Sequence, residues 1–272
     1  MTFTATLALQ YAAICAAVGV VMTTAESIWH WRRGNYSETG VWPWYVLRTD
    51  HSPIVSAVLT PVLDGTGLLA LLLTRFAAAV LTPACYLAGT KCWFPLLVLI
   101  LSQFLLTFRC RLGGEGGDQM TTVMLAMGLL PQVITDQPAV VNSAALFVGA
   151  QITLAYFASG GAKLFGPLWR RGEALLEIMS HFQFGNPWLM KQLRAHPMFC
   201  RLSCLGAIAF QLSFPLFFLL PEPYAYAYLL GGIAFHVVIA LFMRLYLFVL
   251  TFVGTYPCLV FAREMFRNCA GL

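Results

Sequence analysis

The sequence predicts an all-α fold, a polytopic transmembrane helix bundle of about eight helices with an amphipathic interfacial helix. Two observations support this prediction. Of the 272 residues, 60% are hydrophobic and only 10% are charged, whereas a soluble domain is about 45–50% apolar and about 25% charged. The few charges also lie mostly between long uncharged stretches. Such a chain cannot solvate a globular surface, which excludes a soluble enzyme, a nucleic-acid-binding module and a disordered protein.

A helix that crosses a bilayer needs about 20 apolar residues, and eight stretches are close to this length. The second stretch, residues 66–89, requires Arg75 to be paired or to line a cavity. The last stretch, residues 246–262, holds Gly254, Thr255 and Pro257, which favour a broken or re-entrant helix. Continuous runs rich in Leu, Ala and Phe are too long for barrel strands. The predicted segments are 5–25, 66–89, 92–109, 119–135, 140–163, 202–220, 224–243 and 246–262.

We expect a single transmembrane domain over residues 1–272, with no soluble domain. No basic residue precedes the first apolar run, so a cleavable signal peptide is not expected. Residues 29–48 are rich in Trp, Tyr and Arg, which is typical of an anchor at the membrane interface; the alternative is a recognition surface for a partner peptide. Residues 168–184 mix apolar and charged positions at helical spacing and predict the amphipathic helix, which Asn186-Pro187 would end.

The net charge of +5 is modest. Basic residues follow the first, third, fifth and seventh segments, as the positive-inside rule expects of a multi-pass protein. On this pattern the Arg-rich side is cytoplasmic and the N-terminus lies outside. Nucleic-acid binding would instead require basic residues clustered with exposed aromatic rings.

Polar groups inside apolar segments are functional candidates, because the bilayer makes them costly. Lys163 ends the uncharged run 137–162, behind the small residues Ala158 to Ala162, which allow a helix or a flat ligand to approach closely. A desolvated lysine there would supply a neutral amine as a base. The alternative is a lysine that extends from the helix end to the lipid headgroups.

Three further polar residues stand out. His236 lies in the middle of an apolar segment, where it relays protons, binds a ligand carbonyl or bonds to another helix. Gln211 also needs partners, either in a neighbouring helix or in a ligand. Asp118 closes the glycine-rich loop 113–118, either as a helix cap or as part of a ligand site. No cluster of metal ligands or catalytic triad is present, so no metal site is predicted.

One motif resembles the membrane domain of vitamin K-dependent gamma-carboxylases and the wider bacterial family of horizontally transferred transmembrane (HTTM) proteins. Its residues are Tyr156-Phe157, Gly160, Lys163-Leu164, Trp169 and Gly172. His236, which follows Gly231-Gly232, is similar to an intramembrane histidine of that family, and Gly117-Asp118 to a glycine–aspartate pair in its bacterial members. The resemblance covers about residues 5–262.

The resemblance implies that a quinol such as vitamin K hydroquinone is the cofactor. In the carboxylases, the lysine that matches Lys163 is the proposed base for the quinol, which then reacts with oxygen and generates the base that deprotonates glutamate. The resemblance gives catalytic roles to Lys163 and His236, and candidate cofactor-binding roles to Tyr156, Gly160, Gln211 and Asp118.

The large extramembrane domain of the carboxylases has no counterpart here, so a companion subunit would have to hold a peptide or protein substrate. Small members of the family mature a secreted toxin peptide of the sporulation-delaying kind beside a second protein. The resemblance therefore also implies the bacterial inner (cytoplasmic) membrane as the location.

Three functions follow as hypotheses. The first is a gamma-carboxylase-like membrane enzyme that modifies or matures a peptide, surrounded by membrane lipids and without nucleic acid. The second is a non-catalytic membrane partner that holds a secreted or toxin peptide for another protein, for which Lys163 would be dispensable. The third is a small-molecule transporter, which the absence of an internal repeat in the sequence disfavours.

Overall fold

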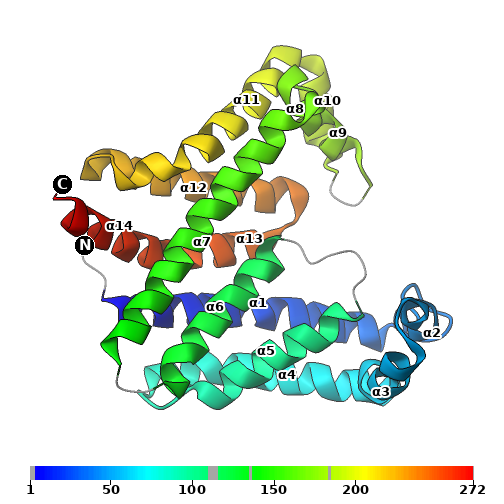
Figure 1. Cartoon of the computed structure of the whole chain (residues 1–272). Coiled ribbons are helices and arrows are strands. Elements are labelled where there is room, and N and C mark those ends of the chain that lie inside the picture. The colour runs from blue at the N-terminus through cyan, green and yellow to red at the C-terminus, as the bar shows by residue number, and fades with distance from the viewer. Residues whose placement is uncertain (1–3, 110–115, 135–136, 183–184, 272) are drawn as a thin grey trace. The chain divides into compact units, whose positions relative to one another are not determined.

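The computed structural model describes residues 4–109, 116–134, 137–182 and 185–271, and within these ranges the chain is helical and has no strand. The all-α class predicted from the sequence is confirmed. The helices are α1 (Ala5–Arg32), α2 (Trp44–Leu47), η1 (Arg48–Asp50), α3 (Pro53–Leu63), α4 (Gly65–Leu87), α5 (Trp93–Thr107), α6 (Gly116–Val133), α7 (Pro138–Phe165), α8 (Pro167–Arg171), α9 (Ala174–Ser180), α10 (Pro187–Ala195), α11 (Pro197–Ser213), η2 (Phe214–Phe218), α12 (Glu222–Met243), α13 (Tyr246–Gly254) and α14 (Tyr256–Ala270) (Figure 1).

Six segments of the described chain are long and apolar enough to cross a membrane, as in a multi-pass membrane protein. They are α1, α4, α7, α11 with η2, α12, and α13 with α14. The predicted segment 92–109 forms α5, whose 15 residues span only about 22 Å of a hydrocarbon core about 30 Å thick. The predicted segment 119–135 forms α6, which begins with the polar run Gly116–Gln119.

The last segment is broken, as its Gly, Thr and Pro residues predicted. α13 ends at Gly254 and α14 begins at Tyr256. Between them, the hydroxyl of Thr255 donates to the carbonyl oxygen of Phe252 at 2.6 Å. Pro257 stands in the first turn of α14, where its missing N–H leaves no helix bond unmade.

The predicted amphipathic helix over 168–184 is not one continuous helix. Gly172 has a left-handed backbone with φ of 81°, and this separates α8 from α9. Asn186 begins a new helix instead of only ending one, since its side-chain oxygen accepts from the backbone N–H of Leu189 at 3.0 Å. Apolar side chains of this region pack against protein in a buried cluster of Ala174, Met179, Leu193, Cys200 and Cys204.

The chain divides into two compact units, one of residues 9–144 and one of residues 1–8 and 145–272. One boundary falls inside α7, so the N-terminal end of α7 belongs to the first of these units and the remainder to the second. The other boundary falls near the start of α1, after Ala8.

Arg75 links the helices of the 9–144 unit. Arg75 is 4% exposed. It donates to Thr24 Oγ1 of α1 at 3.1 Å and to Ser102 Oγ of α5 at 3.0 Å, and also to Gln103 Oε1. The carboxylate of Asp118 in the first turn of α6 attracts it electrostatically. Arg75 is therefore paired inside the bundle, as its position in a membrane segment required.

The aromatic segment 29–48 is partly buried within the same unit. Trp44 is 1% exposed, and its Nε1 donates to Thr60 Oγ1 at 2.8 Å. The guanidinium of Arg109 lies 4.8 Å from the Tyr36 ring and 5.8 Å from the Trp44 ring. Other rings of the segment, Trp29 among them, are exposed. An anchor at the membrane interface needs exposed rings on a folded support, and this segment has both.

We predict that Arg75→Met lowers the free energy of unfolding by about 3 kcal/mol, because Thr24, Ser102 and Gln103 would lose a buried charged donor. Thermal unfolding of the detergent-solubilised protein measures the loss. Arg48→Met, at an exposed position of the same unit, is the matched control and should unfold like the wild type. Equal effects of the two changes would contradict a linking role for Arg75.

Candidate functional site

The candidate site lies in the 145–272 unit, where glycines bring helices close together. A Cβ on Gly160 of α7 would lie 2.7 Å from the backbone nitrogen of Leu212 and 3.0 Å from Cβ of Gln211, so α7 and α11 cross here almost in backbone contact. Gly149 allows a similar approach to α14, since its Cβ would lie 2.7 Å from Cβ of Ala262. The small-residue stretch before Lys163 therefore serves helix packing at Gly160.

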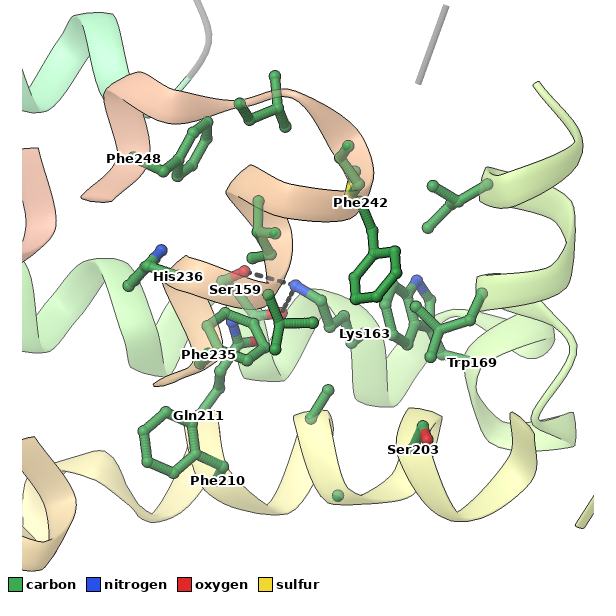
Figure 2. Close-up of a pocket in the computed structure, with 18 of the residues that line it drawn as sticks. Ser159, Lys163, Trp169, Ser203, Phe210, Gln211, Phe235, His236, Phe242 and Phe248 are labelled. Atoms are coloured by element: carbon green, nitrogen blue, oxygen red, sulfur yellow. Dashed lines mark hydrogen bonds between the residues drawn. The ribbon is translucent and has the colours of Figure 1, made fainter. Parts of the chain in front are cut away.

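A cavity of about 610 Å³ opens beside this crossing, within the same unit. Its walls are largely aromatic and aliphatic, and Figure 2 shows several of the rings around it: Trp169, Phe210, Phe235, Phe242 and Phe248. Three of the predicted polar side chains, Lys163, Gln211 and His236, reach its surface from three different helices. A volume of this size with an apolar wall and a few polar groups is typical of a ligand site.

Lys163 extends back along α7 instead of beyond the helix end. Its Nζ donates to Oγ of Ser159 at 2.7 Å and to the carbonyl oxygen of Ser159 at 3.4 Å, one turn toward the middle of the helix (Figure 2). The Trp169 ring lies 5.1 Å from Nζ. A lysine that reaches the headgroups would extend in the opposite direction. The amine therefore belongs to the cavity wall.

His236 is 2% exposed, and its Nε2 lies 2.8 Å from the hydroxyl of Tyr156. Tyr156 is 1% exposed and lies 2.9 Å from a second hydroxyl, that of Tyr256 in α14. The Phe252 ring packs against the imidazole with 4.2 Å between ring centres. Among the described residues, Nδ1 of His236 has no hydrogen-bond partner.

Gln211 is 5% exposed and lies on α11 at the crossing with α7. Its Oε1 also has no hydrogen-bond partner within the described part of the chain. A buried polar atom without a partner costs about 1–3 kcal/mol. Both Gln211 and His236 line the cavity, so a small side-chain rotation would bring either atom to a ligand that supplies the missing hydrogen bond.

The other two candidate cofactor-binding residues lie elsewhere. Gly160 is covered by the backbone of α11, so it packs helices and does not line the cavity. Asp118 belongs to the 9–144 unit, where it interacts with Arg75. It stands within the first turn of α6, which begins at Gly116 and not at Gln119 as predicted. Residues 113–115 of the predicted glycine-rich loop lie outside the described residues.

Two residues that contribute to the site were not predicted from the sequence. Ser159 was grouped only with small residues, although its position four before Lys163 places it on the same helix face. Tyr256 was passed over as part of a broken apolar segment. A tyrosine hydroxyl within such a segment needs a partner, and that need is the signal that could have identified it.

Comparisons of the chain with protein-family models, with curated proteins and with solved structures found no match.

We predict that Gly160→Ala lowers the free energy of unfolding by about 2 kcal/mol, because the new methyl group would overlap α11. Gly161→Ala is the matched control, since a Cβ there meets nothing within 4 Å. Alanine favours a helix over glycine by about 1 kcal/mol, so the control should be neutral or stabilising. Thermal unfolding of both variants in the same detergent tests this, and an equal loss in both would contradict a tight crossing at Gly160.

Proposed function

We propose that this chain is an integral-membrane enzyme related to the gamma-carboxylases and HTTM proteins, which uses a quinol-like or lipid cofactor to modify or mature a peptide. The cavity of the 145–272 unit would hold the cofactor. The single observation that supports this most is the convergence of Lys163, His236 and Gln211 on one apolar cavity.

The residues present suit a quinol. Its ring would pack against the aromatic wall. After a small rotation of the two side chains, its oxygens would bond to the two atoms that have no partner in the described chain, His236 Nδ1 and Gln211 Oε1. The cavity of about 610 Å³ is large enough for a bicyclic ring with part of an apolar tail. When bound, a quinol supplies the reducing electrons for the reaction with oxygen.

In this proposal, Lys163 accepts a proton from a hydroxyl of the cofactor. Ser159 Oγ, at 2.7 Å, can donate to the neutral amine before the transfer and accept from the ammonium after it. The face of Trp169, 5.1 Å from Nζ, attracts the ammonium and so favours the product of the transfer. The apolar walls exclude water that would compete for the proton.

The substrate of this enzyme would be a peptide or protein presented by a companion subunit, at the bacterial inner membrane. The exposed rings of the 29–48 segment in the other unit offer an interfacial anchor. Trp44 and Tyr36 of that segment make internal contacts, which leaves fewer of its rings to hold a peptide.

A direct test of cofactor binding is organic extraction of the protein purified from its membrane, followed by mass spectrometry. We expect a quinone or quinol at close to one molecule per chain. Gln211→Leu removes Oε1, one of the two atoms without a hydrogen-bond partner in the described chain. It should lower the occupancy by the quinone several-fold. An extract that holds only phospholipid would contradict the proposed cofactor.

Lys163→Met tests the base. With vitamin K hydroquinone as the probe and the protein in lipid nanodiscs, we expect the rate of oxygen consumption, corrected for empty nanodiscs, to fall at least about 100-fold, as for loss of a general base. Lys191→Met, at an exposed position on α10, is the control and should keep the wild-type rate. Full activity of Lys163→Met would exclude its catalytic role and favour a non-catalytic partner.

A further inference from the structure

Two tyrosine hydroxyls behind His236 form a continuous hydrogen-bonded chain with it. Nε2 of His236 lies 2.8 Å from the Tyr156 hydroxyl, which lies 2.9 Å from the Tyr256 hydroxyl. The three residues come from α12, α7 and α14, and lie 80 and 100 positions apart in the sequence. Tyr156 lines the cavity, whereas Tyr256 does not. Tyr256 therefore does not contact a ligand in the cavity directly, and its hydrogen-bonded connection to one runs through Tyr156 and His236.

The local structure makes room for this chain. A Cβ on Gly232 of α12 would lie 2.0 Å from the Tyr256 hydroxyl oxygen and 3.0 Å from that of Tyr156. The break at Thr255 lets Tyr256 begin a new helix. The Tyr156 ring is held by stacking on Phe214, with 3.8 Å between ring centres. The Tyr156 hydroxyl is thus held next to His236, and the Tyr256 hydroxyl next to that of Tyr156.

The chain can run in two directions, because a tyrosine hydroxyl both donates and accepts. In one direction, Nε2–H of His236 donates to Tyr156, which donates to Tyr256. Nδ1 then carries a lone pair and accepts from a ligand hydroxyl. In the other direction, Tyr256 donates to Tyr156, which donates to Nε2. Nδ1 then carries the hydrogen and donates to a ligand carbonyl.

We infer that Tyr156 and Tyr256 are positioning residues that let His236 bind one ring oxygen both as a hydroxyl and as a carbonyl. This inference rests on the proposed function, since a quinol and its quinone differ at this oxygen in just this way. The pair would allow His236 to keep its hydrogen bond to this oxygen before and after oxidation of the cofactor. Within His236, Tyr156 and Tyr256, only the hydroxyl hydrogens and the imidazole hydrogen change position.

Tyr256→Phe separates this role from a purely structural one. It removes the far partner, so the Tyr156 hydroxyl keeps a single neighbour in the chain and donates to Nε2 of His236, since a buried hydroxyl hydrogen without an acceptor is costly. Nδ1 then carries the hydrogen permanently. We expect the affinity for a quinol to fall relative to that for the quinone, changing the ratio of dissociation constants by at least about fivefold.

The probes are 2,3-dimethyl-1,4-naphthoquinone and its reduced diol, titrated by calorimetry against the protein in nanodiscs under nitrogen. Tyr228→Phe is the matched control. It removes a tyrosine hydroxyl bond in the same unit, to Ser213 at 3.0 Å, at a residue outside the cavity wall. It should leave the ratio unchanged. An unchanged ratio in Tyr256→Phe, or an equal loss of both affinities, would overturn the inference while the proposed cofactor stands.

A wild-type protein that binds neither probe would instead overturn the proposed function and this inference with it.

A second readout does not need a ligand. In protein labelled with ¹⁵N-histidine, the ring nitrogen shifts report which nitrogen of His236 carries the hydrogen, and Tyr256→Phe should place it on Nδ1. Tyr156→Phe removes the hydroxyl that connects Tyr256 to His236. Adding Tyr256→Phe to this variant should therefore leave the ring nitrogen shifts of His236 unchanged. A further change in that double variant would contradict the chain.

Discussion

A polar atom buried among membrane helices has no water to bind, so its partner must lie in the protein or in a ligand. Arg75 satisfies this requirement through groups on α1 and α5. Arg263 does so through the carbonyl oxygens of Phe217 and Leu220, which hold α14 against η2. Nδ1 of His236 and Oε1 of Gln211 do not satisfy it within the described chain. Because both line one cavity, the same constraint that stabilises the helices identifies the site.

The cavity depends on helix packing that only glycine allows. At Gly160 the backbones of α7 and α11 nearly touch, which holds Gln211 against α7. At Gly232 the missing side chain leaves the space that the Tyr156 and Tyr256 hydroxyls occupy. The 145–272 unit is therefore tight at the crossing and open beside it.

Much of the fold could be predicted from local properties. Apolar length predicted the long helices, and Gly254, Thr255 and Pro257 predicted the break in the last one. The amphipathic segment was mispredicted as one helix, because periodicity did not show that Gly172 takes a left-handed conformation. α5 and α6 were counted as full spans because apolar length did not show where the helices begin and end: α5 has only 15 residues, and α6 begins within the polar run at Gly116.

The amino-acid sequence by itself determined the class of fold and the polar residues that a membrane helix must account for, including Lys163, His236 and Gln211, because scarcity of charge is a property of composition. Only the tertiary structure decided which of the candidates meet. It brought these three to one cavity, placed Gly160 under α11 and Asp118 in the other unit, and added Tyr256. Helical periodicity states which residues share a face, but the partner of that face lies many residues away and depends on how the helices pack.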